Sequence, residues 1–217
     1  YGLGDPLVEI PIIPVSMGGT MDEAVAGLVA AKPNVIFMPV APVELATIMG
    51  GVYGGGHQTA MYIGAGPTWN LGLLGQEALV PLLEAAYFMT AYWLPWSTDT
   101  PGHNAMRAAA EEAGRGPEYA SSAYSAGWTM QYPIKAALQL AIENGDLTRA
   151  GIMAAAQSLT DVDYEGMLPN RGFAGTAAED AWRIATVNRI DTSMPDGLSS
   201  VFWQAGPTAS AYDFAAP

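Results

Sequence analysis

The chain has 217 residues, of which half are apolar and 13% are charged, with 25 glycines and 16 prolines. This is the composition of a folded chain that is long enough to bury one or two cores. Its 21 acidic and eight basic residues give a formal charge of −13. That balance argues against nucleic acid or an anionic membrane surface as a partner, because both require clustered lysine and arginine. The sequence contains no cysteine, which excludes disulfides, thiolate metal sites and cysteine nucleophiles.

The first part of the chain predicts a strand followed by a helix. Leu7–Val15 has the composition of a strand, and its prolines favour the edge of a sheet, because proline has no N–H to donate to a neighbouring strand. Thr20 and Glu23 then form a capping box. They predict a helix over Met21–Lys32 that ends before Pro33.

Residues 33–69 predict a β-α-β unit. A strand over Val35–Val40 leads through the Ala41-Pro42 loop into a helix over Val43–Val52, and a second strand follows over Ala60–Ile63. Such units build parallel sheets, whose ligands bind at the carboxyl ends of the strands. Both strand ends carry Pro, Gly, Ala, Thr or Trp and no obvious acid, base or nucleophile. The sequence therefore predicts an α/β fold whose site holds a molecule and does not react with it.

The remaining chain predicts further helices and strands without an internal repeat. The longest apolar stretch, Ala78–Trp96, contains Pro81, Glu84 and Pro95, which argues against a membrane-spanning helix. The expected elements are a partly helical segment over Leu71–Glu84 interrupted by Pro81, a strand over Ala86–Trp93, helices over His103–Ala113, Tyr124–Glu143 and Thr148–Leu159, and strands over Trp182–Arg189 and Ser200–Trp203.

No motif predicts a metal, a cofactor or a catalytic centre. His57 and His103 lack the spacing of metal ligands. Gly64-Ala65-Gly66 has the first half of a dinucleotide fingerprint, but Trp69 occupies the position of its third glycine. The nearest candidate acid or base is Glu44, which follows the Ala41-Pro42 loop. On a first helical turn, Glu44 is more simply explained as a partner of the helix dipole.

Aromatic side chains are the residues with the greatest potential to bind a ligand. Trp69 and the preceding Thr68 lie in the loop after a predicted strand, and Trp93 lies at the end of another. Stacking on a ligand and packing in the core are about equally supported for Trp69. Core packing is the alternative explanation for Trp93 as well.

The ordered series of these segments resembles the type I periplasmic binding proteins of ABC transporters, in the branched-chain amino acid and amide group. The match begins at Tyr1-Gly2-Leu3-Gly4, which is similar to the YGxG that opens the second lobe in that family. It continues through GTMDEAVAGLVAAKPNVIFM, APVELATIMGGVYGGG, EAAYFMTAYWLPW, YSAGWTMQYPIKAALQLAIENGDLTRAGIMAAAQSL and YEGMLPNRGFAG. No single motif is highly specific, but the series covers nearly the whole chain.

The resemblance implies Rossmann-like parallel sheets in two lobes that close over a small solute. Residues 1–85 would form the ligand-binding part of the second lobe, residues 86–160 the hinge return and first-lobe helices, and residues 161–217 the closing strands and tail. The early first-lobe segments of the family have no counterpart in this sequence, nor has the helix that usually follows YGxG. Ligand contacts carried over by position, together with the aromatic candidates, are Tyr1, Ala41, Pro42, Gly64, Ala65, Gly66, Thr68, Trp69 and Trp93.

The resemblance further implies a solute-binding protein without catalysis that delivers its ligand to an ABC transporter permease. It implies a periplasmic or extracellular location, with or without a lipid anchor, and a monomer or weak dimer. Members that bind amino acids often have a tyrosine in the first loop and an acid in the second, and this sequence has neither. An unpaired buried ammonium group costs several kcal/mol. We therefore expect a small polar, amide-like or aromatic solute rather than a zwitterion, with an amino acid as the less favoured option.

Two other functions remain open on the same fold. One is a ligand-sensing regulatory domain, which an effector or transmembrane segment elsewhere in the gene would support. The other, less favoured, is a Rossmann-like enzyme that uses Glu44.

Overall fold

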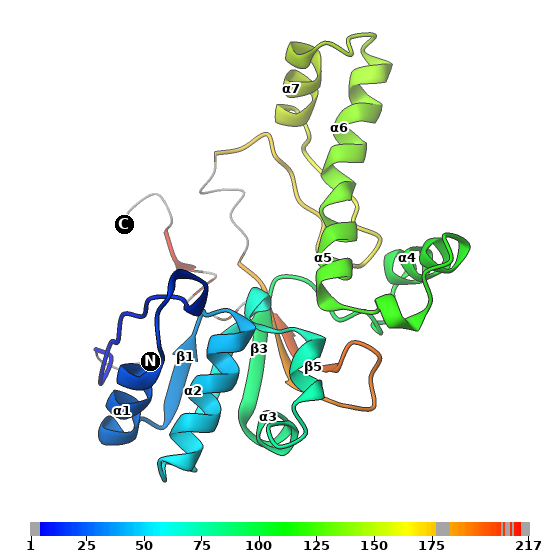
Figure 1. The fold of residues 1–217 in the computed structure, drawn as a ribbon. Coiled ribbons are helices and arrows are strands. Elements are labelled where there is room, and N and C mark those ends of the chain that lie inside the picture. Colours follow the sequence, from blue (N-terminus) through cyan, green and yellow to red (C-terminus); the bar gives the residue numbers. More distant parts are fainter. Residues whose placement is uncertain (1–4, 177–182, 205, 207–208, 210, 214–217) are drawn as a thin grey trace. The chain divides into compact units, whose positions relative to one another are not determined.

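The computed structural model describes residues 5–176, 183–204, 206, 209 and 211–213. Two compact units divide the chain. Unit 1 comprises Tyr1–Ala91 and Val187–Val201, and unit 2 comprises Tyr92–Thr186 and Phe202–Pro217. Each unit is therefore built from segments that are distant in the sequence, and each is described by itself below (Figure 1).

A five-stranded sheet with the spatial order β1-β2-β3-β4-β5 organises unit 1. β1 pairs in parallel with β2, and β2 pairs in parallel with β3, which confirms the predicted α/β class. A short turn joins β4 to β5, and Asp191 N donates to Gly197 O across it (3.0 Å), so the sheet is mixed. The strands are β1 (Val35–Met38), β2 (Met61–Ala65), β3 (Tyr87–Ala91), β4 (Ala185–Ile190) and β5 (Leu198–Gln204).

Helices connect the first three strands, as a parallel sheet requires. α2 has proline in its first turn, where no intrahelical N–H is needed, and ends in the predicted glycine cluster. α3 likewise begins with Pro81 in its first turn, so this proline starts a helix and does not interrupt one. The helices of unit 1 are α1 (Asp22–Ala31), α2 (Pro42–Gly54) and α3 (Val80–Ala86), with 3-10 turns η1 (Val15–Met17), η2 (Gly66–Thr68) and η3 (Leu71–Gly75).

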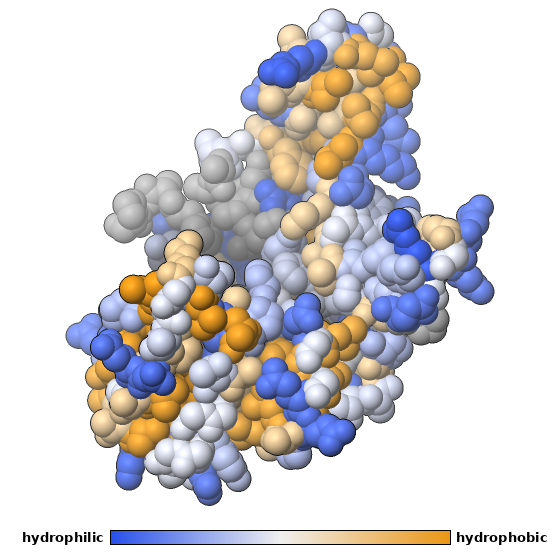
Figure 2. Space-filling model, in the orientation of Figure 1, coloured by the Kyte–Doolittle hydropathy of each residue, from blue (hydrophilic) through white to orange (hydrophobic). Residues whose placement is uncertain are grey.

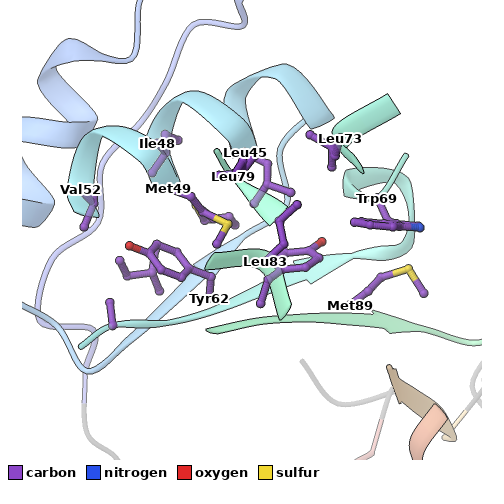
Figure 3. Packing of buried hydrophobic residues seen from close by; sticks show 14 of the residues in the cluster. Leu45, Ile48, Met49, Val52, Tyr62, Trp69, Leu73, Leu79, Leu83 and Met89 are labelled. Carbon is purple, nitrogen blue, oxygen red and sulfur yellow. The ribbon is translucent and has the colours of Figure 1, made fainter. Parts of the chain in front are cut away.

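The core of unit 1 lies between these helices and one face of the sheet. Alternate residues of β1 and β2 are buried, because successive side chains of a strand point to opposite faces. Figure 3 shows side chains of α2 directed toward Tyr62 of β2 and Met89 of β3. Leu45, Met49 and Val52 of α2 have no measurable exposure. The periodicity that predicted the β-α-β unit therefore corresponds to a real packing layer.

Unit 2 is mainly helical in the part that the structure describes. One cluster of buried residues gathers around Met106 and Met167, and a second around Tyr164 and Leu168. The helices are α4 (Pro101–Glu112), α5 (Ser122–Thr129), α6 (Gln131–Glu143) and α7 (Arg149–Gln157), with a 3-10 turn η4 (Pro117–Tyr119).

The predicted single helix over Tyr124–Glu143 is two helices. α5 ends at Thr129 and α6 begins at Gln131. Pro133 lacks the N–H that would bond the carbonyl of Thr129 four residues earlier, which removes one link from the helical ladder. The prediction correctly placed helix on both sides of this point and missed the interruption.

Two predictions at the beginning of the chain are wrong. Leu7–Val15 is not a strand: its residues up to Pro14 form no ladder, and Val15 opens a 3-10 turn. The capping box at Thr20 does not form, because α1 starts one residue later, after Met21, and no side chain caps it. In Leu7–Val15 the prolines removed donors that a sheet neighbour would need.

The two compact units do not coincide with the three consecutive regions expected from the sequence. The segment 161–217 contributes to both units. Across the part of the chain that the structure describes, no helix is both long and apolar enough to cross a bilayer.

Candidate functional site

The loops after β1 and β2 lie side by side at one edge of the sheet. Met38 near the end of β1 is in register with Gly64 of β2. Residues 39–41 then lead to Pro42, the first residue of α2, while β2 passes into η2 at Gly66. This edge holds the Ala41-Pro42 and Gly64-Ala65-Gly66 loops, which the sequence predicted to contact a ligand. Together these two loops form the predicted wall.

Threonine hydroxyls satisfy the backbone at both strand ends. Thr68 Oγ1 donates to Met38 O (3.3 Å), which ties the second loop to the end of β1. Thr90 Oγ1 of β3 donates to Gly64 O (3.0 Å). Thr68 itself is buried, so its hydroxyl holds the loop in place.

Only part of the predicted wall offers surface to a ligand. Ala41 is exposed, and Pro42 and Ala65 are half-buried, whereas Gly64 and Gly66 are buried. The accessible groups are methyl and pyrrolidine carbons together with backbone amides. Such a surface offers packing and neutral hydrogen bonds and carries no charge of its own.

Gly64 is required by packing inside the sheet. A Cβ at this position would lie 2.2 Å from the hydroxyl oxygen of Tyr87 and 2.9 Å from its ring. Tyr87 is completely buried on the neighbouring strand β3. The glycine therefore makes room for an aromatic ring, and the fingerprint-like spacing of Gly64-Ala65-Gly66 needs no nucleotide to explain it.

Trp69 packs inside unit 1. Its side chain is 6% exposed, its indole Nε1 donates to Asp196 O (3.2 Å), and its ring lies 6.3 Å from that of Tyr87 at an interplanar angle of 25°. Gly197 has φ of +69°, and a Cβ there would be 2.9 Å from the indole. The loop that joins β4 to β5 thus covers the ring, which gives Trp69 the packing role of the two considered from the sequence.

Glu44 is an acidic residue close to these loops, and it faces the N-terminal segment. Glu44 is 2% exposed. Oε1 accepts a hydrogen bond from Val15 N (2.9 Å), and Oε2 has no hydrogen-bond partner among the described residues. The described residues include no cluster of three or more His, Cys, Asp or Glu side chains that could hold a metal. Glu44 thus serves as an anchor for the preceding segment.

Two of the predicted contacts, Trp93 and Tyr1, lie outside the described part of unit 1. Trp93 belongs to unit 2, where it is buried. Its ring packs edge to face against that of Tyr92, with the ring centroids 4.8 Å apart. Tyr1 lies outside the described residues. Their roles as ligand contacts stay predictions.

The ring of each histidine lies within hydrogen-bonding distance of an oxygen atom of another residue. His57 Nε2 lies 2.7 Å from Pro33 O. His103 is completely buried in the first turn of α4, where its Nδ1 lies 2.7 Å from Thr100 Oγ1. Burial, together with the nearby Arg107 and against the opposing effect of a hydrogen bond to the Leu94 backbone, lowers the pKa of His103 to about 4. This histidine is neutral at physiological pH.

A groove along β1 is the feature that the sequence did not reveal. It has a volume of about 660 Å³ and is lined mostly by apolar side chains of the N-terminal segment, α1, β1 and α2, together with Glu9, Ser16 and Glu44. The exposed side chains of Leu7, Val35 and Phe37 lie along its lining. The only local sequence signal that could have indicated this groove is the strand-like composition of Leu7–Val15.

Comparisons with solved structures identify the architecture. A fatty acid ABC transporter substrate-binding protein from Thermomonospora curvata matches 89% of this chain and 49% of its own, with a TM-score of 0.78 at 24% identity. The chain has the fold of about half of a type I ABC transporter substrate-binding protein. This agrees with the resemblance seen in the sequence.

Two further structures support the same fold. An ABC transporter substrate-binding protein from Aeropyrum pernix has a TM-score of 0.67 at 12% identity and matches 86% of this chain and 48% of its own. A branched-chain amino acid ABC transporter protein from Thermus thermophilus with bound valine has a TM-score of 0.64 at 12% identity, over 88% and 50%. The chain spans about half the length of these structures. No protein-family model and no curated protein matches it.

Proposed function

We propose that the chain forms part of an extracytoplasmic solute-binding protein that captures a small molecule for an ABC transporter permease. The observation that carries this proposal is the match of 89% of the chain to a transporter substrate-binding protein with a TM-score of 0.78. The loops at the carboxyl ends of β1 and β2 would supply one wall of the binding cleft, since open α/β sheets bind ligands at that edge.

The chemistry of this wall favours an uncharged or largely apolar solute. Ala41, Pro42 and Ala65 present carbon and backbone groups, while the carboxyl of Glu44 is buried and bonded to Val15 N. An ammonium group placed here would lose its water without gaining a counter-charge, which costs several kcal/mol. An amide-like or aromatic solute meets the surface without that penalty. One structural relative is described as a fatty acid transporter protein, and another holds valine.

Differential binding of a neutral aromatic amide and a zwitterionic amino acid tests the solute class. We would titrate the purified chain with benzamide and with L-valine and follow the backbone amide signals of Ala41, Ala65 and Gly66 by NMR. Benzamide should shift these signals progressively, and L-valine should leave them unchanged, because only the second probe brings a charged ammonium group.

The variant Ala41→Asp provides the matched control. It adds a carboxylate at an exposed position of the wall, so it should allow L-valine to shift the same signals without improving the response to benzamide. Shifts with L-valine alone in the native chain, or no shift with either probe, would contradict the proposal.

A further inference from the structure

A small pocket in unit 2 lies where α4 meets the junction of α5 and α6. It has a volume of about 260 Å³. All of its lining residues belong to unit 2, whereas the wall at the ends of β1 and β2 belongs to unit 1. The lining consists of Ala105 of α4, Trp128 of α5, Gln131, Tyr132 and Lys135 of α6, and Glu165 of the loop after α7.

Glu165 holds a backbone conformation that residues with a side chain rarely adopt. Its φ is +52°, in the left-handed region that glycine enters freely and other residues enter at a cost. The backbone is fixed on both sides, since Glu165 N donates to Asp163 Oδ1 (2.8 Å) and Glu165 O accepts from Gly102 N (2.9 Å). Glycine would fit this position with less strain, so the carboxyl side chain calls for a role of its own.

One oxygen of this carboxyl is bound and the other is available. The Tyr132 hydroxyl donates to Glu165 Oε2 (3.0 Å). This hydroxyl fits because Gly102 has no side chain: a Cβ there would lie 2.9 Å from it. In the part of the chain that the structure describes, no hydrogen bond or ion pair engages Oε1. The pocket therefore contains a half-buried, positioned carboxylate with an open acceptor.

The remaining lining favours an organic cation. Trp128 and Tyr132 are half-buried, so part of each aromatic side chain is accessible, and aromatic rings attract cations through their quadrupole. The described residues hold no cluster of three or more His, Cys, Asp or Glu that could bind a metal ion. A primary ammonium group is strongly hydrated, and it would lose that water in a mostly apolar pocket. An alkylated ammonium group has less water to lose.

The size and surroundings of the pocket favour a small, water-soluble ligand. Its volume of about 260 Å³ is below the range of about 300–1,000 Å³ that drug-sized ligands occupy. Figure 2 shows strongly hydrophobic surface over α6 and α7 and mainly hydrophilic surface over α4, which forms one side of the pocket. The formal charge of −13 of the chain also attracts cations.

We propose that this pocket binds a small quaternary ammonium compound of the size of choline. The alkylated nitrogen would lie beside Trp128 and Tyr132, and the Glu165 carboxylate would balance its charge. Tyr132 is also a positioning residue, because its hydroxyl holds the carboxylate. Lys135 is exposed and lines the same pocket, so its charge would oppose the ligand and limit the affinity.

Two probes of equal shape isolate the contribution of charge. Neohexyl alcohol is choline with a carbon atom in place of the nitrogen, so it keeps the shape and has no charge. We would titrate the purified chain with each probe and follow the indole N–H signal of Trp128 by NMR. Choline should shift this signal in a saturable manner, and neohexyl alcohol should bind about tenfold more weakly or not at all.

Two substitutions change the charge of the pocket in opposite directions. Glu165→Gln keeps the size of the side chain and removes its charge, and it should weaken choline binding about tenfold or more. Lys135→Gln removes the opposing charge at an exposed position, and it should strengthen choline binding about threefold. Neither substitution should change the response to neohexyl alcohol. Circular dichroism would verify that both variants fold.

Three results would overturn the proposal. One is no saturable shift of the Trp128 signal with choline. Another is equal affinity for choline and neohexyl alcohol, which would show that the pocket does not recognise charge. The third is unchanged choline affinity in Glu165→Gln. None of these results bears on solute binding at Ala41 and Ala65, which is followed by other signals, so the two proposals fail independently.

Discussion

Burial decides the role of individual residues that look functional in the sequence. Trp69 follows a strand end, where ligands commonly bind, yet its indole is covered by Gly197 and bonded to Asp196 O. Glu44 follows the same edge, yet its carboxyl anchors Val15. In both cases the partner is distant in the sequence, so no local pattern announces it.

We expect substitution of Trp69 to lower the stability of unit 1 and to have no direct effect on solute binding. Trp69→Ala should lower the free energy of unfolding of unit 1 by about 3–5 kcal/mol, the usual cost of removing a large buried aromatic side chain. Trp69→Phe keeps most of the packing, and it should cost about 1–2 kcal/mol through the lost hydrogen bond and reduced volume. Urea denaturation measures both effects. Native stability combined with lost solute binding in Trp69→Phe would restore a role in ligand stacking.

His103 makes unit 2 sensitive to acid. Burial lowers its pKa to about 4 in the folded chain, against 6.5 in the unfolded chain. The unfolded chain therefore binds a proton that the folded chain excludes as pH falls from 6.5 to 4, and stability decreases through this window by about 3 kcal/mol. NMR titration of the imidazole C–H signal should give a midpoint near 4. A midpoint near 6.5 would show that the ring is solvated.

At the scale of elements, strand formation depends on a partner as well as on composition. The segment over Leu7–Val15 has the alternating burial of a strand but no ladder, whereas Val35–Met38 forms a strand because β2 lies beside it. The helices follow their sequence signals more closely, since their hydrogen bonds are local. Pro133 breaks a helix for a reason that is also local.

The contact between β2 and β3 gives a prediction at this scale. Gly64→Ala places a methyl group 2.2 Å from the Tyr87 hydroxyl oxygen, and it should destabilise unit 1 by about 1–3 kcal/mol through overpacking. Tyr87→Phe alone should be nearly neutral, because the buried hydroxyl has no hydrogen-bond partner in the described structure. It should also relieve part of the cost of Gly64→Ala. Thermal unfolding of the two single variants and the double variant measures this coupling, and strictly additive effects would refute it.

At the scale of the whole molecule, each unit has its own hydrophobic core. The core of unit 1 contains Met49, Tyr62 and Trp69, and those of unit 2 contain Met106 and Tyr164. We therefore expect calorimetry to show two unfolding transitions. Trp69→Ala should lower the temperature of one and leave the other unchanged. A single transition that shifts as a whole would contradict this expectation.

The sequence by itself determined the β-α-β order, the helical character of Tyr124–Glu143 and the resemblance to substrate-binding proteins. These rest on periodicity, on proline and glycine positions and on segment order, all of which are local or sequential properties. Only the tertiary structure decided that Trp69 packs under the loop before β5, that Gly64 admits the ring of Tyr87 and that β1 has an open edge. Each of these depends on contacts between segments distant in the chain, and such contacts exist only after the fold has brought the segments together.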